Sequence, residues 1–304
     1  MNTVYDMLIV GGGPGGYTAA LYAVRAGLSV AVLEKLAAGG QMAETPKIDN
    51  YPGFPEGIDG FTLGQQMQTQ AEHFGAKSIY CEVTHLSLEG DVKTAETTEG
   101  LFYGKTVVIA TGADPRKLGV PGEAELLGRG VHYCAACDGM FYRDKTVAVV
   151  GGGNTAAADI LLLSRIAKKV IVVHRRDTLR AAKAYHKPLS LLENVAFRWN
   201  SKVRQIQPGQ ITVEDLTSGT AEQLPCDGVF VAIGRQPVTE LVKGSLTLDE
   251  QGYILADEST ATNLPGVFAV GDVRTKDLRQ IVTAVADGAI AAHRAEGYLA
   301  EKEG

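Results

Sequence analysis

Two cysteines separated by two alanines form the segment with the clearest redox chemistry. The run reads Cys134-Ala-Ala-Cys137-Asp138-Gly139, in a chain that has four cysteines. This spacing can close a small disulfide. Four cysteines in 304 residues do not make a disulfide scaffold, and a Cys-x-x-Cys in a chain with so few cysteines more often serves redox or metal chemistry. A structural zinc site needs four ligands, and even with His132 one would be missing. A redox dithiol is therefore the favoured interpretation, with two inert buried cysteines as the alternative.

The aspartate that follows the second cysteine is a candidate for proton transfer. Thiolate chemistry requires a proton to be moved, and Asp138 could move it. A turn or helix-capping role is the alternative for this side chain. The other two cysteines, Cys81 and Cys226, stand alone in the sequence, and we interpret both as structural or incidental.

A glycine-rich turn near the N-terminus predicts a dinucleotide site. An apolar strand over 6–10 turns through glycines into an alanine-rich helix. In this pattern Gly11 permits the tight turn, Gly13 lets a pyrophosphate approach the backbone, and Gly16 lets helix and strand pack closely. Glu34 lies 23 positions after Gly11, where an acid binds ribose hydroxyls and repels a 2′-phosphate. The segment fits FAD or NAD, with a purely structural turn as the alternative.

A second glycine turn repeats the first with the opposite charge. From Gly151 to His174 the distance is again 23 positions, but the acid has become a base, followed by Arg175, Arg176 and Arg180. Guanidinium groups bind phosphate oxygens bidentately, so this cluster fits the 2′-phosphate of NADPH. A solvated basic helix start is the alternative. The other candidate residues at this turn are Gly153, Asn154, Thr155 and Ala156.

Further candidates for FAD lie in loops and at strand ends. Side-chain amides after the first turn could reach an isoalloxazine ring, and a glycine-aspartate tip could hold ribityl or phosphate oxygens. Taken alone, each is more often a turn or cap residue. These candidates are Pro14, Gly40, Gln41, Asn50, Thr111, Gly112, Gly271, Asp272, Arg279 and Gln280.

The order of the predicted elements indicates two interleaved domains. Each glycine turn sits in a βαβ pattern of continuously apolar strands, typical of parallel sheets covered by helices. We predict an α/β fold with two Rossmann-like domains. Residues 1–113 and 243–304 form a discontinuous FAD-binding domain, and 114–242 form an inserted NADPH-binding domain that carries the dithiol.

Net charge and hydrophobicity argue against some classes of binding partner. The 304 residues carry a net charge of −6 and a pI near 5.6, which argues against nucleic acid or an anionic membrane as a partner. No apolar run approaches the ~20 residues needed to span a bilayer. The N-terminus runs into a strand with no basic region or cleavage site, so we expect a cytoplasmic protein.

Together these motifs closely resemble the bacterial low-molecular-weight thioredoxin reductases. The resemblance rests on GGGPGGYTAALYAVRAGL, IDNYPGF, CAACDG, GGGNTA, HRRDTLRA and GVFAVGDVRTKDLRQ, and above all on a dithiol inside the NADPH domain. It implies FAD in the first domain, NADPH in the second, a homodimer, and thioredoxin as the disulfide substrate. One departure is Ala158-Asp159, where the family often has two glutamates.

The resemblance also implies the order of electron transfer. Hydride passes from NADPH to FAD, then electrons pass to the Cys134–Cys137 disulfide, and dithiol exchange reduces thioredoxin. The inserted domain would rotate about junctions near 112–116 and 234–243. The sequence leaves open which cysteine faces the flavin; we take Cys137, which leaves Cys134 to attack the substrate. Three alternatives remain: a related flavin enzyme with another dithiol partner or a donor such as ferredoxin, a non-enzymatic redox sensor, and a zinc protein.

Overall fold

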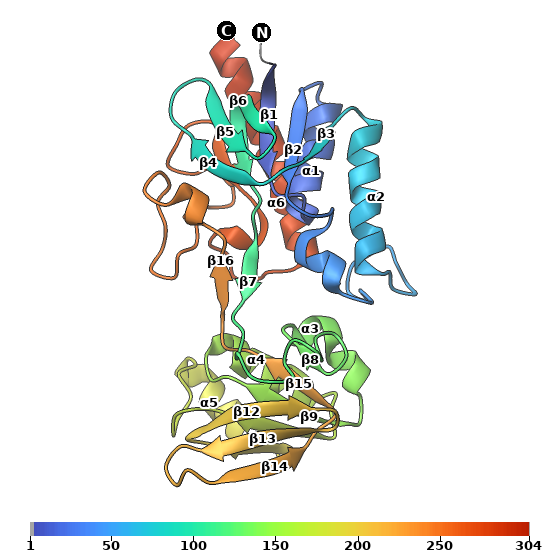
Figure 1. The fold of residues 1–304 in the computed structure, drawn as a ribbon, viewed down its shortest axis with the longest axis vertical. Helices are drawn as coiled ribbons and strands as arrows, with labels where there is room; N and C mark the ends of the chain where they lie inside the picture. Colours follow the sequence, from blue (N-terminus) through green and yellow to red (C-terminus); the bar gives the residue numbers. More distant parts are fainter. Residues whose placement is uncertain (1–2, 304) are drawn as a thin grey trace. The chain divides into compact units, whose positions relative to one another are not determined.

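The computed structural model describes residues 3–303, and the chain forms two compact units. Unit 1 comprises Met1–Asp114 and Gln236–Gly304, and unit 2 comprises Pro115–Arg235. Each contains a mainly parallel sheet with helices, so the predicted α/β class is confirmed (Figure 1). No helix within residues 3–303 is long and apolar enough to cross a membrane.

Unit 1 is built on a seven-stranded sheet. The strand order is β3-β2-β1-β6-β5-β4, and β17 also pairs with β6. The parallel strands are β1 (Val4–Val10), β2 (Val30–Glu34), β3 (Lys77–Tyr80), β6 (Gly100–Ile109) and β17 (Val267–Ala269). Strands β4 (Val83–Ser87) and β5 (Lys93–Thr97) extend it in antiparallel pairing. The helices are α1 (Pro14–Arg25), α2 (Gly60–His73) and α6 (Ile281–Glu303).

Alternate side chains of β1 belong to two different cores. Met7 and Ile9 pack with the alanines of α1 and α6, whereas Leu8 and Val10 pack with apolar residues from β4, β5 and residues 241–256. This alternation is the two-residue period of a strand buried on both faces. Helices α1 and α6 approach closely because Gly288 faces Gly15, where an added Cβ would collide with the carbonyl oxygen. The start of α1 is thereby fixed against the sheet.

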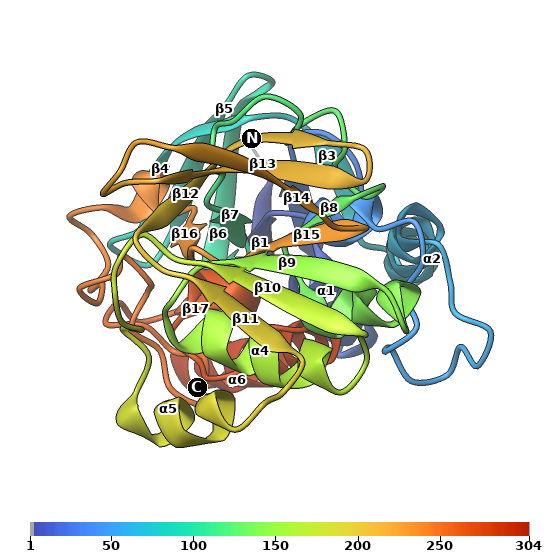
Figure 2. The ribbon, with the colours of Figure 1, turned by 90° about the horizontal axis from the view of Figure 1, so that it is seen from below.

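Unit 2 contains a five-stranded parallel sheet and a three-stranded antiparallel sheet. The parallel order is β11-β10-β9-β15-β8, formed by β8 (Val131–His132), β9 (Thr146–Val150), β10 (Lys169–Val173), β11 (Val195–Arg198) and β15 (Gly228–Val231). The second sheet holds β12 (Ser201–Gln207), β13 (Gln210–Asp215) and β14 (Ala221–Pro225). Figure 2 shows α4 (Asn154–Ser164) and α5 (Lys183–Ser190) on one face of the parallel sheet and β12–β14 on the other.

The core of unit 2 follows the same alternation. Val147 and Val149 of β9 pack with Ile160 of α4, whereas Ala148 and Val150 pack against the three-stranded sheet. The strand is continuously apolar because both of its faces are covered. Its last residue leads directly into the second glycine turn, so the packing of β9 fixes the position of that turn.

The chain crosses between the units in two short strands. These are β7 (Ala113–Pro115) and β16 (Arg235–Pro237), which pair with each other. Residues 236–242 belong to unit 1, so the predicted boundary at 242/243 is wrong by this short segment. The physical reason is Val242, at the end of a 3₁₀ turn (Glu240–Val242), which is buried in the core of unit 1.

Candidate redox and dinucleotide-binding sites

The two central cysteines of unit 2 are joined. Cys134 precedes the one-turn helix α3 (Ala135–Asp138), and Cys137 lies within it. They form a disulfide with their Cα atoms 5.3 Å apart, and the Cys134 Sγ also accepts the backbone N–H of Cys137 at 3.2 Å. Both are partly exposed, unlike the free and buried Cys81 and Cys226. The accessible pair is therefore the one suited to exchange with a substrate disulfide.

The free cysteines are poorly suited to thiolate chemistry. Burial raises the pKa of Cys226 to about 12, and the neighbouring Asp227 charge adds to this effect. Burial likewise raises the pKa of Cys81. A thiol nucleophile must ionise, so these environments favour the structural interpretation of both residues.

A histidine and a tyrosine that the sequence analysis did not connect lie beside Asp138. His132, on β8, places Nδ1 3.0 Å from the Asp138 carboxylate and Nε2 2.7 Å from the hydroxyl of Tyr142. Both ring nitrogens are thus engaged, so His132 is not directed at the cysteines as a third zinc ligand. Within residues 3–303, no group of three or more His, Cys, Asp or Glu side chains is arranged to hold a metal.

The first glycine turn has the geometry that a pyrophosphate requires. Gly11 has φ of +107°, and a Cβ there would lie 2.5 Å from the Ala110 carbonyl oxygen. A Cβ on Gly16 would collide with the Gly11 oxygen, whereas Gly13, which caps α1, faces open space. The backbone is therefore accessible where the free N–H groups of the helix start.

Glu34, the predicted ribose-binding acid, is hydrogen-bonded to this turn. Glu34 accepts the N–H of Gly12 at 2.6 Å through one oxygen and the N–H of Leu36 at 2.9 Å through the other. Each carboxylate oxygen can accept two hydrogen bonds, so both keep capacity for ribose hydroxyls. Two backbone hydrogen bonds thus hold the carboxylate against the glycine turn.

Several of the other predicted flavin contacts meet at one edge of the unit 1 sheet. Gly11 follows β1, Thr111 follows β6 and Gly271 follows β17, and these three strands are parallel neighbours. Their carboxyl ends lie together, which is where open α/β sheets bind ligands. The Asn50 Nδ2 also donates to the Gln280 Oε1 at 3.0 Å, although the two residues lie 230 positions apart in the sequence.

Polar contacts also hold the remaining flavin candidates. The Gln41 amide donates to the Ala113 carbonyl at 2.6 Å, and the Arg279 guanidinium lies 4.0 Å above the ring centroid of Tyr253. These contacts hold Gln41 in a 3₁₀ turn (Gly40–Glu44) and Arg279 just before α6.

A buried ionic cluster supports the turn after β17. Asp287, on α6, accepts the Gly271 N–H at 2.8 Å, pairs with two nitrogens of Arg274 at 2.7 and 3.0 Å, and receives Lys276 at 2.6 Å. All three charged side chains are at least nine-tenths buried. Burial acts to raise the pKa of Asp287, but the hydrogen bonds from Arg274 and Lys276 outweigh it and lower the pKa. The sequence signal was a single aspartate in an alanine-rich helix, and the sequence analysis did not use it.

In unit 2, backbone hydrogen bonds join the segment after the basic cluster, residues 180–182, to the second glycine turn. The Gly152 carbonyl accepts the backbone N–H groups of Arg180 and Ala181, at 2.7 and 3.0 Å, and Asn154 accepts that of Ala182 at 2.8 Å. Gly153 faces open space at the start of α4. The glycine turn and the basic cluster are thereby brought together, as the matched spacing predicts.

The electrostatics of this turn favour an anion. Arg175, Arg176 and Arg180 are exposed, whereas His174 is buried, and its Nε2 has no hydrogen-bond partner among the described residues. Burial lowers the pKa of His174, and the three arginines lower it further. A buried nitrogen without a partner beside three cations fits a phosphate-bearing ligand.

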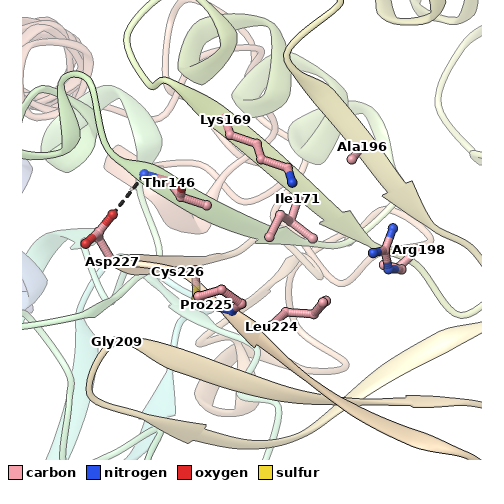
Figure 3. Close-up of a pocket in the computed structure, with 10 residues that line it drawn as sticks. All are labelled: Thr146, Lys169, Ile171, Ala196, Arg198, Gly209, Leu224, Pro225, Cys226 and Asp227. Atoms are coloured by element: carbon pink, nitrogen blue, oxygen red, sulfur yellow. Dashed lines mark hydrogen bonds between the residues drawn. The ribbon is translucent and has the colours of Figure 1, made fainter.

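A separate pocket of about 240 Å³ lies in unit 2 (Figure 3). Thr146 and Lys169, which begin β9 and β10, help to line it, together with Cys226 and Asp227. Asp227 accepts the Thr146 N–H at 2.9 Å. None of its lining residues belongs to the glycine turn, the basic cluster or the dithiol, so this pocket is distinct from the candidate sites.

The comparisons with known proteins identify the class. The family model for pyridine nucleotide-disulphide oxidoreductases matches residues 5–288, and the chain belongs to this family. Thioredoxin reductases from Streptomyces clavuligerus and Treponema pallidum are 46% and 43% identical, with 99% and 98% of this chain and 95% and 98% of theirs aligned. The crystal structure of thioredoxin reductase from Streptococcus pyogenes MGAS5005 matches with a TM-score of 0.93 at 46% identity, covering 99% of this chain and 100% of that one. The predicted membership among bacterial low-molecular-weight thioredoxin reductases is confirmed, as is the two-domain Rossmann-like fold.

Proposed function

We propose that this chain reduces the disulfide of thioredoxin with electrons from NADPH, carried through FAD and the Cys134–Cys137 pair. The observation that carries the proposal is the accessible disulfide in unit 2, which also holds the basic nucleotide turn. The relatives named above bear the same activity in their names. A flavin, when bound, supplies two-electron transfer between nicotinamide and disulfide.

FAD would be held by unit 1. Gly13 and the start of α1 would face the pyrophosphate, and Glu34 would accept the adenosine ribose hydroxyls. Asp272, at the turn supported by Asp287, would contact the ribityl or phosphate groups, and the Asn50–Gln280 pair would lie near the isoalloxazine ring. The open space above Gly13 supports this assignment.

NADPH would be held by unit 2. Gly153 and the start of α4 would bind its pyrophosphate, and Arg175, Arg176 and Arg180 would bind the 2′-phosphate. The unpartnered Nε2 of His174 supports a ligand at this position. An acid in place of the histidine would favour NAD instead.

The dithiol would reduce thioredoxin by two exchanges. The Cys134 thiolate attacks one sulfur of the substrate disulfide, which forms a mixed disulfide and releases one substrate thiolate. Cys137 then attacks the Cys134 sulfur, which restores the Cys134–Cys137 disulfide and releases the second thiolate. Two protons pass to the reduced substrate, and Asp138 would transfer one of them. The homodimer and the cytoplasmic location stay predictions.

Two measurements test this proposal. Acid denaturation of the purified protein should release free FAD, identified by its mobility and fluorescence. NADPH-driven reduction of thioredoxin, followed with a dithiol reagent, should require this protein, and reduced ferredoxin should not replace NADPH. A colourless protein that FAD cannot reconstitute, or turnover with ferredoxin alone, would refute the assignment.

A further inference from the structure

Three side chains from three elements of unit 2 form a continuous chain of hydrogen bonds that begins at the residue after Cys137. Asp138, adjacent to Cys137 on α3, bonds His132 of β8 at 3.0 Å, and His132 bonds Tyr142 at 2.7 Å. Tyr142 ends the 3₁₀ turn Gly139–Tyr142. Histidine and tyrosine are 5% and 6% exposed, so water competes little for these bonds.

The packing leaves the histidine ring one orientation. Phe230 of β15 stacks on it with ring centroids 5.3 Å apart at 27°, and Tyr142 meets it edge-on at 5.2 Å. β8 is also held in register with β15, where His132 pairs with Phe230. The Nδ1 atom is therefore fixed toward the Asp138 carboxylate.

The direction of the hydrogen bonds follows from the tyrosine. Burial, with the Asp138 and Asp227 charges, raises the pKa of Tyr142 to about 12, so its hydroxyl stays protonated at neutral pH. In neutral His132 the hydroxyl then donates to Nε2, and the proton on Nδ1 is donated to Asp138. When His132 gains a second proton, both nitrogens donate and the Asp138–His132 pair holds one proton in reserve.

Other titratable groups act on this chain from neighbouring elements. The Lys145 ammonium lies 5.5 Å from the Tyr142 ring centroid. The negative charges of Asp138 and Asp227 act on the Tyr142 hydroxyl. Lys145 and Asp227 act on the tyrosine end, so Asp138 is the only partner at Nδ1 among the described contacts.

We propose that His132 is a positioning residue for Asp138, which it orients beside the dithiol and resupplies with protons; this rests on the proposed function. Two electrons reduce the Cys134–Cys137 disulfide and leave two thiolates. Protonated His132 passes its Nδ1 proton to the Asp138 carboxylate, Asp138 gives a proton to one thiolate, and solvent reprotonates the imidazole. The bound cofactor named above supplies the electrons.

Three variants separate positioning from simple packing. His132→Phe keeps a ring against Phe230 and removes both hydrogen bonds. His132→Asn places an amide donor near the position of Nδ1 but cannot titrate. The matched control is Tyr133→Phe, because the Tyr133 hydroxyl bonds Glu123 at 2.9 Å and lies outside the chain.

The first readout is thioredoxin turnover between pH 5.5 and 9. His132→Phe should lower kcat about tenfold or more, up to the 10²–10⁴-fold that a positioned acid contributes, and leave KM for NADPH unchanged. His132→Asn should recover the part of the rate that depends on the orientation of Asp138 and lose the pH dependence of the histidine. Combining His132→Phe with Asp138→Asn should be no slower than Asp138→Asn alone, because the two act as one unit.

The second readout needs no turnover. The pH profile of iodoacetamide alkylation of the dithiothreitol-reduced dithiol should change in His132→Phe and stay unchanged in Tyr133→Phe. Unchanged alkylation and kcat profiles in His132→Phe would overturn the proposal, as would a His132→Asn variant that keeps both the rate and the pH profile of the unmodified protein. If the unmodified protein fails to reduce thioredoxin, the proposed function fails, and the alkylation profiles still decide the role of His132.

Discussion

Replacing Asp287 by asparagine should destabilise unit 1 strongly. The substitution preserves shape but leaves Arg274 and Lys276 buried without their carboxylate, whose oxygens lie 2.6–3.0 Å from three of their nitrogens. Removing one partner of a buried ion pair costs about 3–5 kcal/mol. At an m-value of about 2 kcal/mol/M, the urea midpoint of the unit 1 transition should fall by about 1.5–2.5 M.

The matched control is a surface aspartate, Asp91, whose ion pair has the same length as the Arg274–Asp287 contact of 2.7 Å. Asp91 accepts Lys302 at 2.7 Å, but both side chains are more than half exposed. Asp91→Asn should therefore leave the midpoint unchanged within error, because solvent screens exposed pairs. The two variants change the same chemical group and differ in burial.

The effect of Asp287 on stability should depend on pH. The pKa of Asp287 is lowered from its ordinary value of 3.8, so the stability that this carboxylate contributes is present above that value and is lost as pH falls toward the folded pKa. The difference between the unmodified protein and Asp287→Asn should shrink below pH 4. Equal urea midpoints for Asp287→Asn and Asp91→Asn at pH 7 would refute the reasoning.

Three further results are expected. The double variant Arg175→Ala/Arg176→Ala should raise KM for NADPH at least tenfold and change NADH kinetics little, because charge-assisted bonds contribute about 1.5–3 kcal/mol each; equal kinetics with both nucleotides in the unmodified protein would contradict this. Burial raises the pKa of Asp159 to about 7, so the stability of unit 2 should fall as pH rises from about 4 to 7. Asp159→Asn should make the urea midpoint of unit 2 less dependent on pH over this range. An unchanged pH dependence of the midpoint would exclude Asp159 as the cause. Iodoacetamide at pH 8 should label Cys81 and Cys226 of the oxidised protein only in denaturant; labelling under native conditions would contradict their burial.

Local patterns predicted much of the fold and both glycine turns. Glycines have few roles between an apolar strand and an alanine-rich helix, and the spacing to Glu34 and to His174 repeats because both units use the same βαβ geometry. The position of these two side chains at the turns is seen in the structure. The paired cysteines could be predicted because their distance is set by one helical turn.

Contacts between distant segments could not be predicted in this way. The Asn50–Gln280 pair and the Asp287 cluster join residues through tertiary packing, which leaves no periodic signal. Val242 was assigned to the wrong side of a boundary because a glycine-proline break resembles a domain end even when the next turn enters a core. His132 was considered only as a metal ligand, since its partner Tyr142 lies ten positions away.

The central claim is that the dithiol is the route from the nucleotide to thioredoxin. Rapid-mixing absorbance and steady-state turnover of Cys134→Ser and Cys137→Ser test it most directly, with Cys81→Ser and Cys226→Ser as controls. NADPH should still bleach the flavin absorbance of both active-site variants, because that transfer precedes the dithiol step, while thioredoxin reduction should be abolished. Thioredoxin reduction by Cys134→Ser at the unmodified rate would show that the disulfide is not the route and would contradict the proposed function.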